Sequence, residues 1–206
     1  MTRGRLITIE GLDGAGKTTL AVRLQSALAG GGRHVRVLRE PGGVRAAERV
    51  RELVHDPALE IGPRAEALLY AAARAQLVEE AVEPLLGQGL WVVLDRFVDS
   101  SMAYQGGGRE LGLEAVGAIN AFASGGLRPD CTLLLVIPPD VGQARIAARG
   151  QPPDRLELEQ AGFFARVASA YEALAAQDPE RIRRIDATQP PDQVLADSLR
   201  ALADLV

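Results

Sequence analysis

The stretch that decides the fold is Gly11-Leu12-Asp13-Gly14-Ala15-Gly16-Lys17-Thr18-Thr19. It contains the spacing of a P-loop, in which Gly-Lys-Thr follows a first glycine after four residues. The glycines allow backbone N–H groups to surround phosphate oxygens, and the following helix adds the positive end of its dipole. We expect Lys17 to reach the outer phosphates of a bound nucleoside triphosphate and the Thr18 hydroxyl to ligate Mg²⁺.

The residues around this stretch alternate between strand-like and helix-like patterns. We expect strands at 5–10, 34–39, 90–95, 132–137 and 181–185. We expect helices at 17–29, 44–54, 64–86, 113–123, 141–148, 156–176 and 191–206, and a short one from 100 that the glycines 106–108 break. Pro84 is expected to kink or shorten the 64–86 helix near its end. The alternation predicts a single three-layer α/β domain over 1–206, with a parallel sheet of about five strands and helices on both faces.

Composition narrows the class of protein. A net charge of −4 argues against a general nucleic-acid-binding surface. No apolar run approaches the ~20 residues that span a bilayer, and residues 1–5 lead into a strand without a signal-peptide core. The single cysteine, Cys131, excludes an intrachain disulfide, and its place at the start of an apolar run predicts a buried structural thiol. We therefore expect a cytoplasmic protein without a nucleic-acid or membrane partner.

The use of cations separates the P-loop from the rest of the chain. The sequence has 22 arginines and one lysine, and that lysine is Lys17. An ammonium is a compact point charge that can lie along a phosphate chain, whereas a guanidinium is a wide planar fork. A guanine-specificity motif of the Asn/Thr-Lys-x-Asp type needs a second lysine, so a GTPase switch is excluded. A small-molecule kinase is favoured, and a nucleotide-binding regulatory protein without turnover remains the alternative from another class.

Four further segments carry polar side chains where loops follow strands, the usual ligand edge of an open α/β sheet. They are 39–43, 68–76, 95–105 and 145–155. With the P-loop they form an ordered set of motifs: Arg-Glu-Pro-Gly-Gly at 39–43, Asp-Arg-Phe at 95–97, Tyr-Gln-Gly-Gly-Gly-Arg at 104–109 and Asp-Arg at 154–155. Over nearly its whole length the sequence closely resembles thymidylate kinase. This resemblance implies a P-loop nucleoside monophosphate kinase that uses ATP and Mg²⁺ to convert dTMP to dTDP, and it implies a homodimer built on long helices such as 64–86.

The resemblance implies roles for residues at the thymine end of the acceptor. Tyr70 matches the aromatic residue that stacks on the thymine ring, and a phenol keeps the flat face that stacking needs. Arg74 lies one helical turn further on and matches the arginine that contacts the base and monophosphate. Arg51 resembles the arginine near thymine O4, and Ser101 and Gln105 resemble side chains that hydrogen-bond the pyrimidine edge.

Other residues are implied at the phosphate and sugar of the acceptor. Arg96 can hold the acceptor phosphate with two hydrogen bonds. Asp95 is placed like a Walker B acid, acting on Mg²⁺ through water; a structural ion pair is the alternative for these two residues. Tyr104 resembles the aromatic residue that crowds the sugar 2′ position. Asp13 matches a carboxylate that approaches the 3′-hydroxyl, and Glu40 is a second candidate near the acceptor.

The segment 145–157 is expected to form a lid over ATP. Arg149 and Arg155 flank a proline-rich loop, and Arg145 lies one helical turn earlier. Gly14 stands where one branch of the family has a catalytic arginine, so the resemblance assigns the catalytic cation to the lid without deciding between Arg149 and Arg155. The implied catalytic set is Asp13, Lys17, Arg96, Arg149 and Arg155. Another nucleoside or nucleoside monophosphate kinase is the alternative within the kinases.

Overall fold

A parallel five-stranded sheet organises the molecule, as the computed structural model of residues 3–150 and 152–206 shows. The strands are β1 (Leu6–Gly11), β2 (Val35–Arg39), β3 (Trp91–Asp95), β4 (Cys131–Val136) and β5 (Ile182–Asp186). Their order is β2-β3-β1-β4-β5, and all neighbours are parallel. The predicted fold class is thus confirmed, with the P-loop following the central strand.

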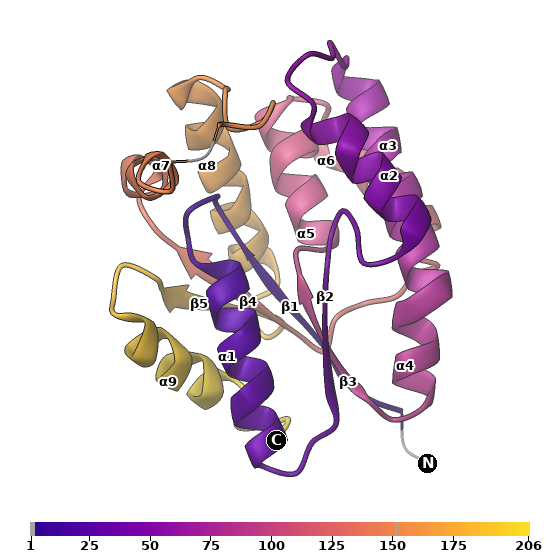
Figure 1. Cartoon of the computed structure of the whole chain (residues 1–206), viewed down its shortest axis with the longest axis vertical. Helices are drawn as coiled ribbons and strands as arrows, with labels where there is room; N and C mark the ends of the chain where they lie inside the picture. Colours follow the sequence, from indigo (N-terminus) through magenta and orange to yellow (C-terminus); the bar gives the residue numbers. More distant parts are fainter. Residues whose placement is uncertain (1–2, 151) are drawn as a thin grey trace.

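Helices cover both faces of the sheet (Figure 1). They are α1 (Lys17–Gly30), α2 (Arg45–His55), α3 (Pro63–Leu77), α4 (Glu83–Gly87), α5 (Val98–Ser101), α6 (Leu113–Ala123), α7 (Pro139–Ala147), α8 (Ala161–Gln177) and α9 (Pro191–Ala201), with π-helical segments η1 (Val78–Val82) and η2 (Met102–Gly108). On β1, Ile7 and Ile9 join the cluster that contains the apolar residues of α1, whereas Leu6 joins the cluster of α3 and α4. This alternation follows the two-residue period of a strand and leaves both sheet faces buried.

The extent of the helix predicted over 64–86 is confirmed, but part of it is π-helical rather than α-helical. It runs from Pro63 to Gly87 and passes through the π-helical segment η1 immediately before α4. A proline ring within a helix collides with the carbonyl four residues earlier, here that of Glu80, and a wider π turn relieves such a clash. Pro84 therefore alters the helix at η1 without ending it.

The prediction that glycines 106–108 break a helix is wrong. The helix that begins at Val98 continues as η2 through Gly108. A Cβ at Gly108 would lie 2.6 Å from the Phe163 ring, and one at Gly107 would lie 2.6 Å from the Ala170 Cβ. These glycines serve close packing of η2 against α8, a function that sequence composition does not distinguish from helix termination.

Two predicted helix bounds are also wrong. The helix predicted from 156 begins at Ala161, because Asp154 accepts hydrogen bonds from the backbone N–H groups of Leu156 and Glu157 and holds that segment in a turn. The last helix ends at Ala201 and not at 206, because the Arg183 guanidinium donates a hydrogen bond to the Ala201 carbonyl. Across residues 3–150 and 152–206, every helix is too short or too polar to cross a bilayer.

Candidate active site

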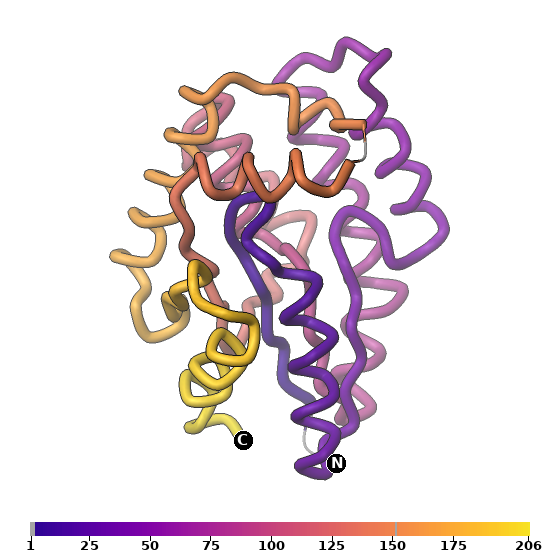
Figure 2. The backbone as a smooth tube through the Cα atoms, turned by 60° about the vertical axis from the view of Figure 1, so that its left-hand side comes forward, coloured from indigo at the N-terminus to yellow at the C-terminus, as the bar shows by residue number. Residues whose placement is uncertain are grey.

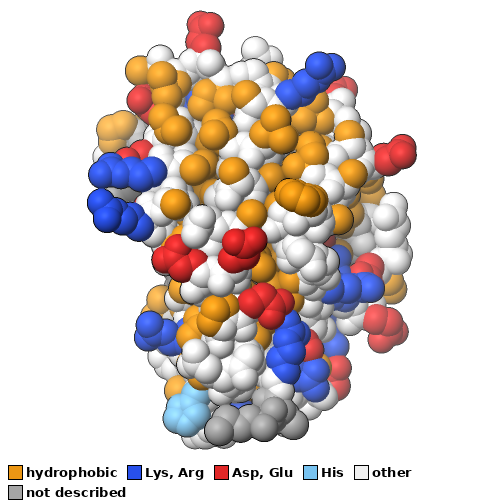
Figure 3. All heavy atoms as spheres, turned by 90° about the vertical axis from the view of Figure 1, so that its right-hand side faces the viewer, with side chains coloured by type: hydrophobic (Ala, Val, Ile, Leu, Met, Phe, Trp, Pro, Cys, Tyr) orange, Lys and Arg blue, Asp and Glu red, His pale blue; other side chains and the backbone are white. Residues whose placement is uncertain are grey.

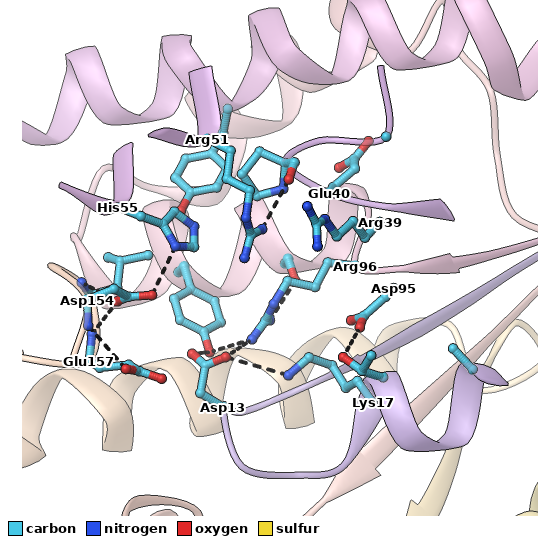
Figure 4. Close-up of a pocket in the computed structure, with 18 of the residues that line it drawn as sticks. Asp13, Lys17, Arg39, Glu40, Arg51, His55, Asp95, Arg96, Asp154 and Glu157 are labelled. Atoms are coloured by element: carbon cyan, nitrogen blue, oxygen red, sulfur yellow. Dashed lines mark hydrogen bonds and ion pairs between the residues drawn. The ribbon is translucent and has the colours of Figure 1, made fainter. Parts of the chain in front are cut away.

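A cavity of about 740 Å³ lies at the carboxyl edge of the sheet. Its walls come from the P-loop, the segment after β2, helices α2 and α3, the segment after β3, and part of 149–157. The close-up in Figure 4 shows charged side chains from these separate segments converging on one space, with Arg96 and Lys17 both directed at Asp13. The structure thus brings together residues that are far apart in the chain.

The lysine of the P-loop is buried over its own loop. Lys17 Nζ donates to the carbonyls of Leu12 at 2.8 Å and Gly11 at 3.2 Å, and it lies 3.7 Å from Asp13. Burial and the neighbouring Arg96 charge lower the pKa of Lys17 to about 8. The ammonium is therefore held in place by loop carbonyls rather than extended into water.

Helix α7 lies directly across the P-loop (Figure 2). Gly14 has a φ of 80°, and a Cβ added there would lie 2.4 Å from the Gly142 carbonyl oxygen. Arg145 donates to the Gly14 carbonyl at 3.3 Å and to the Ala187 carbonyl at 3.0 Å. Arg145, predicted to bind ATP, thus fastens α7 to the loop backbone, and it does not line the cavity.

Thr18 and Asp95 place two oxygen atoms beside the P-loop. The Thr18 hydroxyl donates to Asp95 Oδ2 at 2.6 Å. Within the described part of the chain, no group of three or more His, Cys, Asp or Glu side chains is arranged to hold a metal ion. This donor set fits Mg²⁺, which takes one or two protein oxygens and completes its shell with water and substrate phosphates.

Arg96 occupies a conformation that is unusual for a residue with a side chain. Its φ of 71° lies in the left-handed region, at the turn between β3 and α5. The guanidinium pairs with Asp13 and lies 5.0 Å from the centre of the Tyr104 ring, whose hydroxyl donates to Asp13 at 2.9 Å. Burial alone would raise the pKa of Asp13, but the charges of Arg96 and Lys17 hold it well below its usual range.

A second arginine of the cavity, Arg74, is more deeply buried than Arg96. Arg74 is 1% exposed; it donates to Glu40 Oε2 at 2.6 Å, to the Ser101 hydroxyl at 3.0 Å and to Asn120. Among the described residues, none donates to the other carboxylate oxygen of Glu40, Oε1, which is also buried. Burial raises the pKa of Glu40 although the Arg74 charge opposes this shift. A buried acceptor without a donor calls for an explanation, and a donor on a bound ligand is one that fits a cavity-lining residue.

The remaining residues predicted for the thymine end lie in the same cavity. Tyr70, Arg51 and Gln105 line it together with Arg74 and Ser101. Arg51 donates to the Pro41 carbonyl at 3.1 Å, and Gln105 donates to Glu66 at 2.9 Å. The predicted set is therefore assembled, although its internal hydrogen bonds were not foreseen.

The two lid arginines have different surroundings. Arg149 lines the cavity, and its side chain is 51% exposed and 3.7 Å from Glu157. Arg155 points elsewhere: it pairs with the fully buried Glu66 at 2.5 Å and donates to the Val54 carbonyl at 2.9 Å. Of the two lid arginines predicted to be catalytic, the structure brings only Arg149 to the cavity.

Several residues of this region escaped the sequence prediction. Glu10, Asn120 and Tyr171 form buried hydrogen bonds behind Arg96 and Arg74, and His55 pairs with Asp154 at 3.0 Å. For Glu10 a signal existed, because a carboxylate at the end of a buried apolar strand requires a partner. The others resemble ordinary surface residues of helices, and no spacing in the sequence distinguishes them.

These features define a class of protein. A P-loop follows the central strand of a 2-3-1-4-5 parallel sheet, and the cavity beside it is also lined by Arg74, Arg96 and Arg149. These are the parts of a P-loop small-molecule kinase. The thymidylate kinase family model matches residues 9–197. The chain belongs to the thymidylate kinase family.

Individual relatives are similar over their full lengths. The thymidylate kinase of Alkalilimnicola ehrlichii is 49% identical over 100% of this chain and 95% of its own. The thymidylate kinase of Deinococcus radiodurans is 48% identical over 99% of this chain and 98% of its own. That of Oenococcus oeni is 49% identical, with 99% and 97% covered.

Proposed function

We propose that this protein transfers the γ-phosphoryl group of ATP to dTMP and releases dTDP and ADP. A 5′-phosphate oxygen of dTMP forms a bond to the γ-phosphorus as the bond from that phosphorus to the β–γ bridging oxygen breaks. The observation that carries the proposal is the shared cavity, in which Asp13 of the P-loop directly contacts Arg96 of the acceptor side. Membership of the thymidylate kinase family supports the choice of acceptor.

For the donor, the backbone of residues 11–19 holds the phosphates and Lys17 lies along them. Thr18 and Asp95 are the residues that would hold Mg²⁺, and the ion would neutralise charge on the outer phosphates. Asp13 releases Arg96 when the acceptor phosphate offers the guanidinium a doubly charged partner, and Asp13 then accepts from the sugar 3′-hydroxyl. Glu40 Oε1, buried without a donor among the described residues, is the second acceptor facing the ligand.

For the base, Tyr70 stacks on thymine while Arg74 contacts the base and monophosphate. Arg51, Ser101 and Gln105 surround the pyrimidine edge and line the same cavity. Tyr104 lies against Asp13 and Arg96, a position from which it crowds the sugar 2′ position. Because Arg74, Ser101 and Gln105 are already buried, these three side chains lose little entropy on binding.

For the lid, segment 145–157, we assign the two arginines to different tasks. Arg149 lines the cavity and is half-exposed, so it can reach the transferring phosphoryl group without breaking a buried ion pair. Arg155 would have to leave the buried carboxylate of Glu66, and breaking such a pair costs about 3–5 kcal/mol. Arg149 is the catalytic cation, and Arg155 anchors the lid to the acceptor side.

We also propose that the protein is a homodimer that meets through α3 and α6, which pack beside each other. Leu68 on α3 and Phe122 on α6 are 56% and 90% exposed. Figure 3 shows hydrophobic side chains gathered over the upper part of this face. Light scattering on a size-exclusion column should give twice the mass of the chain, and Phe122→Asp should halve that measured mass.

We further propose that the enzyme is cytoplasmic, because the free Cys131 thiol and the nucleotide substrates fit that compartment.

A steady-state assay tests the reaction. ADP release is measured with ATP and Mg²⁺ and with dTMP, dUMP, dCMP or AMP as the acceptor. We expect the highest kcat/KM with dTMP. The kcat/KM for dUMP, which lacks one methyl group, should be lower by about 10-fold or more. A clear preference for another acceptor would refute the proposal, and the absence of acceptor-dependent ADP release would favour a regulatory nucleotide-binding protein.

A further inference from the structure

Glu10 is a buried carboxylate that the proposed reaction does not use. It lies at the end of β1, directly before the P-loop, and none of its surface is exposed. Its two oxygens accept three hydrogen bonds: from the Phe97 backbone N–H at 2.7 Å, the Ser100 hydroxyl at 2.6 Å and the Tyr171 hydroxyl at 2.9 Å. All three donors belong to the surroundings of Arg96.

Arg96 depends on the same neighbours. Its guanidinium donates to the Ser100 hydroxyl at 3.0 Å and to the Tyr171 hydroxyl at 3.5 Å, and it also donates to the Gly11 carbonyl at 3.1 Å. Its backbone has a left-handed φ of 71°, which persists only where surrounding contacts over-determine it. The Phe97 N–H that Glu10 holds belongs to the next residue in that strained turn.

The direction of the hydroxyl groups explains why a carboxylate suits this position. A hydroxyl has one proton to donate and two lone pairs that accept. When Ser100 and Tyr171 both donate to Glu10, their lone pairs face the Arg96 guanidinium, which has only donors. A residue at position 10 that itself donates would turn a hydroxyl around and place a donor against Arg96.

Thr8 shows what an ordinary polar residue of this strand does. It lies two residues before Glu10 on the same face of β1 and is equally buried. Its hydroxyl bonds to the Thr132 hydroxyl on the neighbouring strand at 2.7 Å, and that bond holds two strands together. Glu10, in contrast, joins β1 to the turn and the two hydroxyls that surround the arginine.

We propose that Glu10 is a positioning residue that fixes Arg96, through the Phe97 N–H and the Ser100 and Tyr171 hydroxyls, where its guanidinium binds the acceptor phosphate. This inference rests on the proposed role of Arg96 toward dTMP. It adds that the affinity for the phosphate is set from behind the arginine, by a side chain that never touches the substrate.

Calorimetric titration of each variant with dTMP and with thymidine tests this role. Thymidine lacks the phosphate. The dissociation constant for thymidine divided by that for dTMP therefore measures how much the phosphate contributes to binding. For Glu10→Gln we expect about 10-fold weaker dTMP binding at pH 8, which lies above the Glu10 pKa of about 7. That factor is the size of one charge-assisted hydrogen bond. Thymidine binding and KM for ATP should be unchanged. Tyr171→Phe removes one hydroxyl at nearly constant volume and should lower the same ratio by a smaller factor.

Two further variants separate the ways in which the proposal can fail. Thr8→Val removes a buried hydroxyl from the same face of the same strand, and it should leave the ratio unchanged even where it lowers the melting temperature. Arg96→Gln should greatly reduce the phosphate contribution, because Arg74 then remains as its arginine contact. If Arg96→Gln does so while folded Glu10→Gln and Tyr171→Phe keep the normal ratio, the role of Glu10 is refuted and the proposed function stands. If Arg96→Gln also keeps the normal ratio, the role of Arg96 itself is wrong.

Discussion

The ionisation of Glu10 predicts a pH dependence of stability. Burial raises the pKa of Glu10 from 4.5 to about 7, and the nearby charge of Asp99 adds to the rise. The folded protein therefore binds this proton more tightly than the unfolded chain does, so stability falls as the pH rises through this range. The loss begins above the unfolded value of 4.5 and is complete above about 7.

The size of the effect follows from the same two values. A shift from 4.5 to about 7 corresponds to about 3 kcal/mol in total, of which about 2.5 kcal/mol falls between pH 5 and pH 8. Glu10→Gln has no proton to lose, so its free energy of unfolding lacks this decrease. The other titrating groups are shared by the two proteins, and the contributions of those that do not interact with Glu10 cancel in the difference between them.

Urea unfolding at intervals from pH 5 to pH 8 measures that difference. Relative to the unmodified protein, Glu10→Gln should gain about 2.5 kcal/mol across this range, whatever its absolute stability at pH 5. Thr8→Val is the matched control, since it alters the same strand without removing a titrating group, and its difference should stay constant with pH. Parallel curves for Glu10→Gln and the unmodified protein would refute the reasoning, because they would mean that the Glu10 pKa is the same in the folded and unfolded states.

Three further predictions concern the cavity and the lid. Arg149→Ala should lower kcat by about 100-fold or more with little change in KM for ATP, measured at saturating dTMP, whereas Arg155→Ala should mainly lower the melting temperature; equal losses of kcat would contradict the division of tasks. Gly14→Ala should destabilise the protein by about 1–3 kcal/mol in urea, because its φ is 80° and its Cβ would meet the Gly142 carbonyl; unchanged stability would show that α7 can move away. Glu40→Gln should raise KM for dTMP and leave KM for ATP unchanged, because it removes the charge from a buried pair on the acceptor side. A larger effect on KM for ATP would contradict the assignment of Glu40 to the acceptor side.

The features predicted correctly from sequence are those that a short stretch fixes by itself. The P-loop needs glycines, a lysine and a hydroxyl at set spacings, so residues 11–19 specify both the loop and the helix that follows. Continuous apolar runs between polar loops similarly specify parallel strands, since both faces of such strands are covered. The polar residues at their carboxyl ends, such as Asp95 and Arg96, then meet at one edge by topology alone.

The features that sequence reasoning missed depend on contacts between distant segments. Glycines 106–108 resemble a helix stop, but their lack of side chains serves the close approach of α8, and no local signal reveals this partner. Arg155 and Arg149 look alike in sequence, and only the fold shows that a carboxylate 89 residues away holds one of them. Side-chain pairing of this kind is decided by tertiary packing, which periodicity and motif spacing do not encode.

That carboxylate, Glu66, also explains how the two sides of the cavity keep their relation. Its side chain is completely buried and accepts from Gln105 at 2.9 Å, from Arg109 at 3.0 Å and from Arg155 at 2.5 Å. Gln105 comes from the acceptor side of the cavity, Arg109 directly follows η2, and Arg155 belongs to the lid segment 145–157. Breaking a buried ion pair is costly, so Arg155 ties the segment at 154–157 to α3 through Glu66. Gln105 and Arg109 attach the acceptor wall to the same carboxylate.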